Sequence, residues 1–237
     1  MKTISLWVCF AWMMLPLGFY PVAFGAGPVS GESVLIEIQR RYETTNDLEA
    51  NFVQEYVGKV MQRPQKGEGK VYFKKKGMMR WDYKSPNQKL ISNGHTLWYY
   101  QPDENQVFIS DVSRVVKERT PLAFLAGEGD LSRDFNLANL NEAVSLREEN
   151  FVLELVPKET TPVLAKLILT VDKKTFYVIQ ADVVDGLGNV TRTRFTNIKT
   201  NLSLPDSFFN FIIPQGTEVL RALEPASPAS GKGTPAK

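Results

Sequence analysis

The chain has 237 residues, of which 43% are hydrophobic and 23% are charged, and its formal net charge is +2. A near-neutral balance argues against a nucleic-acid-binding protein, which needs a basic face, and against electrostatic docking on anionic lipid. Cys9 is the only cysteine and His95 the only histidine, so metal sites built from these two residue types are excluded.

The first 26 residues have the layout of a secretory signal peptide. Lys2 is followed by an uncharged apolar run that ends at Phe24, and then by small residues. We expect cleavage after Gly25, with the next two positions as alternatives; a retained membrane anchor is the other interpretation, although two prolines and a glycine weaken the run as a span. Removal of this segment takes away Cys9, so the mature chain of about 210 residues must be stable without disulfides.

Residues Ser30–Thr45 predict an amphipathic helix. Ser30 can cap its N-terminus, and Glu32 lies in the first turn, where the helix dipole favours an acid. Four apolar residues at helical spacing form one stripe that faces either a core or a ligand. The stripe consists of Val34, Leu35, Ile38 and Tyr42.

From Leu48 the apolar period changes to two, and Ala50 and Phe52 lead a predicted strand. A polar loop over Gly58–Gln65 follows, and Gly67 with Gly69 predicts a bulge or bend at the start of the next strand. Two β-hairpins are predicted after that, because short turn signals separate apolar runs. Their strands are Val71–Lys75 and Met78–Tyr83 around Lys76-Gly77, then Lys89–Ser92 and His95–Tyr100 around Asn93-Gly94.

Two-residue turns fix the pairing within these hairpins. Tyr72 then pairs with Trp81 in the first hairpin, and Leu90 pairs with Leu97 in the second. Gln88 pairs with Tyr99 by the same count. One face of the predicted sheet therefore carries a row of large apolar side chains, which forms either an ordinary core or the wall of a binding cavity. The row consists of Tyr72, Met79, Trp81, Leu90, Leu97 and Tyr99.

The second half of the chain predicts further strands after a helical insertion. Residues Ser113–Asp134 predict one or two short helices, since Thr120-Pro121 resembles a helix start and Leu122, Phe124 and Leu125 follow it. A closing strand is predicted over Asn210–Pro214, and residues 221–237, rich in Pro, Ala, Ser and Gly, predict a disordered tail. The strands in between are Gln106–Val112, Phe135–Leu140, Val144–Arg147, Phe151–Val156, Leu164–Val171, Val178–Val184 and Val190–Ile198.

This pattern predicts a mainly β (α+β) protein. About eleven strands joined by short links form an antiparallel sheet, which curls when it is this long. Two short helical pieces are too few to cover a flat sheet of that size. We therefore expect an incomplete antiparallel β-barrel with a short-helix lid over a hydrophobic cavity.

The sequence carries little that indicates an enzyme. His95 directly follows a turn, where it is solvated, and no G-x-S-x-G elbow accompanies it. The phosphate-binding glycine motifs are absent too. We predict a protein without enzymatic activity and without a cofactor or metal.

Several motifs resemble the periplasmic outer-membrane lipoprotein carrier family, of the LolA type. The resemblance covers residues 30–220, and we take residues 27–220 as one domain. It rests on the G-x-G start and basic end of Gly67–Lys75, on Trp81 and the run LISNGHTLWYYQPDENQV, on Phe52-x-Gln54, on Thr120-Pro121-Leu122 and on Phe209-x-Phe211-x-x-Pro214-x-Gly216.

The resemblance implies a carrier that shields the acyl chains of lipoproteins in the periplasm. Its implied partners are acylated lipoproteins, the inner-membrane lipoprotein-releasing ABC transporter, and an outer-membrane receptor or the outer membrane itself; a monomer is expected. A periplasmic lipid- or lipoprotein-sensing regulator, or a carrier of another lipid, is the alternative. The implied acyl-chain cavity consists of Leu35, Ile38, Phe52, Tyr72, Met79, Trp81, Leu90, Leu97, Tyr99, Leu122, Phe124 and Leu125.

Lys75 occupies the position of a family arginine that bonds to the lid and helps to close it. A lysine offers a point charge in place of a planar fork, and the family's following proline is replaced here by Lys76. Lys75 is either the lid latch or part of a solvated hairpin tip.

Overall fold

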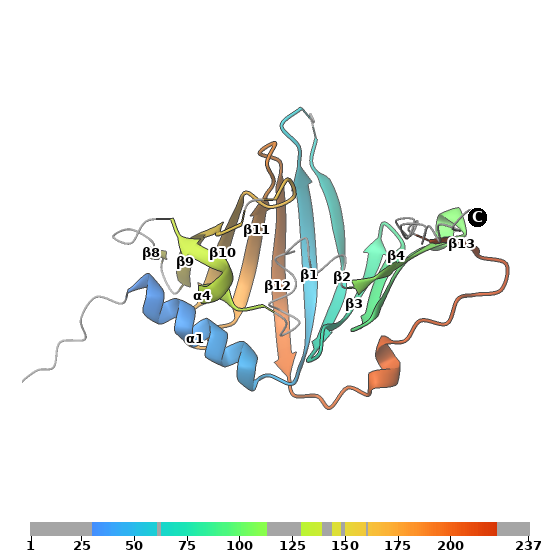
Figure 1. Ribbon diagram of the computed structural model, residues 1–237, viewed down its shortest axis with the longest axis horizontal. Coiled ribbons are helices and arrows are strands. Elements are labelled where there is room, and N and C mark those ends of the chain that lie inside the picture. The colour runs from blue at the N-terminus through green and yellow to red at the C-terminus, as the bar shows by residue number, and fades with distance from the viewer. Residues whose placement is uncertain are drawn as a thin grey trace, which may run out of the picture.

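The computed structural model describes residues 30–60, 63–112, 129–138, 144–147, 150–159 and 161–221. The predicted signal peptide and the lid residues Leu122, Phe124 and Leu125 lie outside these ranges. The described part forms one sheet of thirteen strands, all antiparallel except for one pair, with few helices (Figure 1). The prediction of a mainly β protein is confirmed, although the sheet is mixed and has more strands than expected.

The strands follow one another across the sheet in the order β13-β6-β5-β4-β3-β2-β1-β12-β11-β10-β9-β7, and β8 also pairs with β9. Short hairpin links keep most sequence neighbours adjacent, which antiparallel pairing requires. The bounds are β1 Asp47–Val57, β2 Gln65–Lys74, β3 Met78–Ser85, β4 Gln88–Asn93, β5 Thr96–Gln101, β6 Gln106–Asp111, β7 Phe135–Leu137, β8 Val144–Arg147, β9 Asn150–Pro157, β10 Lys166–Asp172, β11 Val178–Val184, β12 Val190–Thr200 and β13 Glu218–Arg221.

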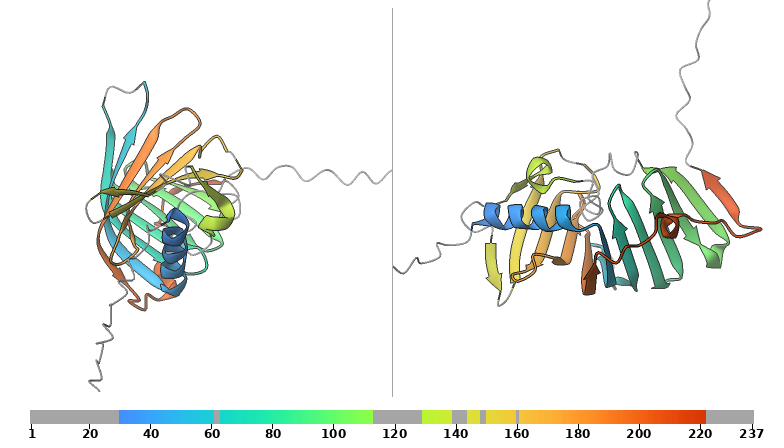
Figure 2. Two further views of the ribbon diagram at one scale, coloured as in Figure 1. Left: turned by 90° about the vertical axis from the view of Figure 1, so that its left-hand side faces the viewer. Right: turned by 90° about the horizontal axis from the view of Figure 1, so that it is seen from below.

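Helix α1 (Gly31–Thr44) lies within the curl of the sheet, across the strands from β9 to β12 (Figure 2). Its predicted cap is confirmed, because the Ser30 side chain accepts a hydrogen bond from the backbone N–H of Ser33 at 3.1 Å. The predicted apolar stripe is buried and joins the core with residues of β9 and β10 such as Leu153 and Leu169. We call the side of the sheet that faces α1 the inner face, and the opposite side the outer face.

A second short helix, α4 (Leu131–Asp134), falls inside the region for which short helices were predicted. Asp130 caps it by accepting a hydrogen bond from the backbone N–H of Arg133 at 2.8 Å. The predicted strand over Phe135–Leu140 is shorter in the structure, where β7 ends at Leu137. Among the described residues, no helix has the length and apolar character needed to cross a membrane.

The prediction of a closing strand over Asn210–Pro214 is wrong. Residues 201–217, which we call the C-terminal strap, run along the outer face of β2–β5 and contain the 3-10 helix η2 (Asp206–Phe209) (Figure 2). The strap ends in β13, which pairs in parallel with β6 and which takes up Arg221, a residue placed in the predicted tail. The remaining tail, 222–237, lies outside the described residues.

Side chains far away in the sequence hold the C-terminal strap in place. The carboxylate of Asp47, which is buried at the start of β1, accepts hydrogen bonds from the backbone N–H groups of Leu202 at 2.6 Å and Leu204 at 3.1 Å. The Lys74 ammonium donates to the Leu204 carbonyl and to the Asp206 carboxylate. That bond and the lysine charge lower the pKa of Asp206. The strap therefore has an irregular backbone but fixed contacts.

Candidate functional site

The register of the first hairpin decides which side chains reach the inner face. Trp81 pairs with Val71, and Met79 with Phe73, because the turn has three residues, Lys75–Gly77. The predicted pairing of Tyr72 with Trp81 is therefore wrong by one residue, and a slip of one residue moves a side chain to the other face. Tyr72 lies on the outer face, where its ring contacts Phe208 of the C-terminal strap at a centroid distance of 4.8 Å.

The second hairpin is shifted by two residues, which leaves its faces as predicted. Leu90 pairs with Tyr99, and Ser92 with Leu97, in place of the predicted Leu90–Leu97 and Gln88–Tyr99 pairs. The loop consists of Gly94 and His95, and Gly94 has a φ of +90°, as the first position of a type II′ turn requires. Leu90, Leu97 and Tyr99 therefore share the inner face with Trp81 and Met79.

A cluster of aromatic rings forms the centre of the inner face. The ring centroid of Trp81 lies 4.7 Å from that of Phe52, 5.7 Å from that of Phe73 and 6.3 Å from that of Phe195. Phe52 and Trp81 were predicted for the site. Phe73 was missed because the predicted register gave its strand the wrong face, and Phe195 was missed because no face was assigned to its strand.

Two glycines of β2 make room beside this cluster. A Cβ atom on Gly67 would lie 3.2 Å from the ring of Tyr83, and one on Gly69 would lie 2.0 Å from the backbone oxygen of Asp82. The predicted bulge is confirmed, since the pairing of β2 with β3 shifts between Glu68 and Gly69. Close approach of the strand backbones therefore requires glycine at position 69, whereas a side chain at position 67 would press against the ring of Tyr83.

The bare backbone at Gly67 lets Tyr83 reach across β2 to the next strand. Its hydroxyl donates to the side-chain oxygen of Gln54 at 3.0 Å, and the Gln54 amide donates to the hydroxyl of Thr193 at 3.1 Å. Burial raises the pKa of Tyr83 to about 12; the neighbouring Tyr99 raises it a little further, and the hydrogen bond to Gln54 lowers it slightly. The phenol is therefore a neutral hydrogen-bond donor at physiological pH.

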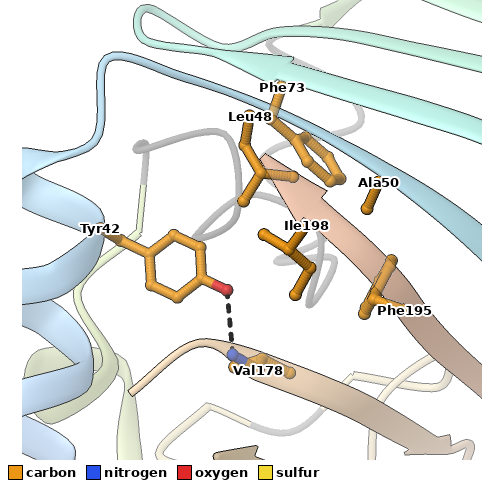
Figure 3. Close-up of a pocket in the computed structure, with 7 residues that line it drawn as sticks. All are labelled: Tyr42, Leu48, Ala50, Phe73, Val178, Phe195 and Ile198. Atoms are coloured by element: carbon orange, nitrogen blue, oxygen red, sulfur yellow. Dashed lines mark hydrogen bonds between the residues drawn. The ribbon is translucent and has the colours of Figure 1, made fainter. Parts of the chain in front are cut away.

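Under α1 the inner face is closely packed. Seven apolar and aromatic side chains surround a cavity of only about 10 Å³, which is room for about one water molecule (Figure 3). The Tyr42 hydroxyl crosses it and accepts a hydrogen bond from the backbone N–H of Val178 at 3.2 Å, and burial raises the pKa of this tyrosine. The lining residues are Tyr42, Leu48, Ala50, Phe73, Val178, Phe195 and Ile198.

Two predicted site residues on α1 lie in different surroundings. Ile38 is fully buried in the core. Leu35 is also buried, but it lines a wider, open cavity of about 510 Å³ between α1 and the segment formed by α4 and β7. Polar groups, among them Glu32 and Lys158, share that wall with Leu35.

Over β4–β6 the usual distribution of apolar side chains is inverted. The outer-facing Ile91 and Val107 have no exposed surface, since this part of the outer face is covered. The inner-facing Leu90, Leu97 and Tyr99 are only half-buried, and Phe108, which is not among the predicted site residues, is 42% exposed. This half of the inner face presents apolar surface that the described part of the chain leaves available to a ligand.

Lys75 contacts α1 in the described part of the structure. Its ammonium donates to the backbone carbonyl of Glu43 at 2.5 Å, and its backbone N–H donates to the carbonyl of Asn46 at 3.0 Å. The carbonyls at a helix C-terminus favour a cation. The hairpin tip is thus tied to the last turn of α1, while the predicted lid partners lie outside the described residues.

The described residues offer little for metal or acid–base chemistry. No group of three or more His, Cys, Asp or Glu side chains is placed to hold a metal ion there. The ionisable side chains of β1, β2 and β12 lie mainly on the outer face, for example as the pair of Lys70 and Glu49 at 3.2 Å. The inner face is therefore mainly apolar over the described residues.

The family model and the relatives that match this chain carry the same description. The family model described as "Outer membrane lipoprotein carrier protein LolA" matches residues 43–212. An outer-membrane lipoprotein carrier protein of Nitrosomonas europaea is 32% identical over 174 residues, covering 73% of this chain and 82% of the relative. A protein of the same name from Azotobacter vinelandii is 28% identical, covering 84% of this chain and 94% of the relative.

Among solved structures, an uncharacterized conserved protein from Thermus thermophilus superposes with a TM-score of 0.51 at 16% identity, covering 81% of this chain and 98% of that chain. At this identity the likeness shows the fold alone. The family match and the carrier names of the relatives confirm the prediction of a non-enzymatic carrier. The chain belongs to the LolA family of outer-membrane lipoprotein carrier proteins.

Proposed function

We propose that this protein shields the acyl chains of lipoproteins released from the inner membrane and delivers them to the outer membrane. The observation that supports the proposal is the half-exposed apolar row Leu90, Leu97, Tyr99 and Phe108 on the inner face. The mature chain, without residues 1–26, acts in the periplasm as a monomer. It receives cargo from the lipoprotein-releasing ABC transporter and passes it to a receptor or to the membrane itself.

The physical task sets what the inner face must do. Each CH₂ group kept away from water contributes about 0.8 kcal/mol, so several long acyl chains would escape through water very slowly without a carrier. A cavity of about 10 Å³ under α1 is far too small for one such chain. For an acyl chain to lie under α1, the space between the curled sheet and α1 must therefore widen, which turns the half-barrel into an open cavity.

The same energetics require that the cavity fits its cargo only partly. A carrier that fitted its cargo as closely as a protein core would not release it. Contacts that hold the empty form closed compete with the cargo, so they favour unloading. We assign this role to Lys75, which ties the hairpin tip to α1, and to the predicted lid that contains Leu122, Phe124 and Leu125.

Mass spectrometry of ligands that co-purify with the protein from periplasm tests the proposal. Triacylated lipoprotein bound at about one copy per chain is the expected result. Free phospholipid or glycolipid in its place would indicate a carrier of another lipid, and a stoichiometric complex with a membrane-bound regulator would indicate a sensor. Either of these two outcomes would contradict the lipoprotein carrier.

We predict that Lys75→Leu loads cargo normally but transfers it to acceptor membranes about fivefold more slowly. The lost hydrogen bond to the Glu43 carbonyl contributes about 1 kcal/mol to closure, so the loaded form gains in relative stability. Lys76→Leu, in the same turn but exposed, is the matched control and leaves transfer unchanged. Transfer by Lys75→Leu at the wild-type rate would remove Lys75 from the mechanism.

A further inference from the structure

Several polar side chains of the inner face have hydrogen-bond partners within the protein. Tyr83 donates to Gln54, and Gln54 to Thr193, as described above. Further along the sheet, the Tyr99 hydroxyl donates to the side-chain oxygen of Gln88 at 2.7 Å. Ser92 is buried, and its hydroxyl donates to the carbonyl of Gly77 at 3.2 Å and accepts from the backbone N–H of Gly94 at 3.1 Å.

Trp81 is the exception among these inner-face groups. Its side chain is 1% exposed, and its indole Nε1–H has no hydrogen-bond partner among the residues that the structure describes. Aromatic rings surround it: the centroids of Phe52 and Phe73, which carry no acceptor group, lie at 4.7 and 5.7 Å, and the stacked ring of Tyr83 lies at 6.2 Å with its hydroxyl bonded to Gln54. Buried N–H groups without a partner are rare in native proteins, and each one calls for an explanation.

The position of Trp81 relates this donor to the binding face. It lies directly opposite Leu90 in the pairing of β3 with β4, and Met79 lies two residues away on the same face. An acyl chain that lies over the half-exposed row Leu90, Leu97, Tyr99 and Phe108 therefore has one end beside the indole of Trp81. Indole is a donor only, so the missing partner must be an acceptor.

We propose that Trp81 donates a hydrogen bond to an ester carbonyl oxygen at the head of an acyl chain of the cargo. This inference rests on the proposed function and narrows its substrate class to acyl esters, as found on the diacylglyceryl group of lipoproteins. A neutral carbonyl suits the site, because a carboxylate or phosphate among these rings would be a buried charge without a counter-ion. The cationic neighbours Lys70, Lys74 and Arg80 belong to the outer face.

The unsatisfied donor also favours the loaded form over the empty form. Leaving a buried N–H unpaired destabilises the closed form, and an ester oxygen removes that penalty. An alkyl chain of the same length contributes the same apolar contacts but leaves the N–H unpaired. The site therefore distinguishes esters from hydrocarbons, which an apolar wall alone does not do.

The test compares two synthetic lipopeptides that differ only in these carbonyls. One carries S-dipalmitoylglyceryl cysteine, and the other carries its S-dihexadecylglyceryl ether counterpart. We expect the wild-type protein to bind the ester about fivefold more tightly than the ether, as one net hydrogen bond provides. Trp81→Phe should reduce this ratio to about one, whereas Trp98→Phe, which changes a half-buried outer-face tryptophan, should keep it.

The ratio of the two affinities cancels the effect of the lost ring volume in Trp81→Phe. If that variant does not fold, 3-benzothienylalanine at position 81 keeps the bicyclic shape and lacks the N–H. A ratio that is the same in wild type and in the position-81 variant overturns the inference, as does equal affinity of the wild type for both probes. Failure of the wild type to bind either lipopeptide would instead contradict the proposed function.

Discussion

Replacing Leu90 by aspartate is expected to weaken the binding of acylated cargo by at least about 100-fold. Leu90 lies in the middle of the inner face, between Trp81 on β3 and Tyr99 on β5. A carboxylate at this point either keeps its water, which prevents an acyl chain from lying over it, or is buried without a partner at a cost of several kcal/mol. Two factors of ten in affinity correspond to only about 2.8 kcal/mol.

The measurement is the displacement of a fluorescent acyl probe by a lipopeptide, together with a thermal melt. Because Leu90 is only half-buried, the empty variant should melt close to the wild type. Val53→Asp is the matched control: it introduces the same charge on the outer face, at a side chain that is 42% exposed, and should bind normally. Wild-type affinity in Leu90→Asp would show that acyl chains lie elsewhere.

The two hairpins show what a sequence predicts well and what it does not. In both, the strands were predicted correctly and the register was wrong, because the turn type depends on backbone dihedrals that residue names do not fix. At the first tip, Lys76 and Gly77 have positive φ, but Lys75 joins the turn, and the slip of one residue moves Tyr72 to the outer face. The second slip, of two residues, was harmless because side chains alternate with period two.

Helix α1 was predicted well because the features that define it are local in the sequence. A cap such as Ser30 and a buried stripe at helical spacing are contacts within a few residues, so the sequence contains them directly. The site was predicted in part: most of its aromatic and aliphatic row lies on the inner face, but Phe73 and Phe195 were missed. Their roles depend on which strands are neighbours, β1 with β12 above all, a pairing of segments about 140 residues apart.

The prediction for the C-terminal strap was the most wrong, and again because the structure there depends on contacts between residues far apart in the sequence. Phe209 and Phe211 alternate as in a strand, yet the backbone there makes a 3-10 turn and then runs irregularly across the outer face. What holds the segment are side chains from the other end of the chain: Asp47, Lys74 and Arg80, whose guanidinium donates to the Phe208 carbonyl at 3.1 Å and lies 4.6 Å from the Phe208 ring centre. No local pattern shows such contacts.

The structure therefore makes the C-terminal strap an essential part of the fold, and Phe209→Ala is the substitution that tests this. Phe209 has no exposed surface, and η2 lies against β3 and β4, where Ile91 is fully buried on the same outer face. Truncating a buried phenylalanine to alanine costs about 3–5 kcal/mol in unfolding free energy, since the cavity that remains is only partly filled by relaxation. For a domain of this size, that corresponds to a melting temperature lower by roughly 10 °C.

Phe211→Ala provides the comparison within the same segment. Phe211 is half-buried and contacts Tyr100 with its ring centroid 5.1 Å away, so its truncation should cost about 1 kcal/mol. Urea unfolding followed by tryptophan fluorescence reports both losses, because Trp81 and Trp98 lie in the sheet that the strap covers.

If Phe209→Ala loses no more stability than Phe211→Ala, the strap is a peripheral attachment, and the burial of Ile91 and Val107 must come from the sheet itself. A large loss for Phe209 alone, with acyl-probe binding retained below the melting temperature, would separate the two faces: the outer face supports the fold, and the inner face is left free to open for cargo.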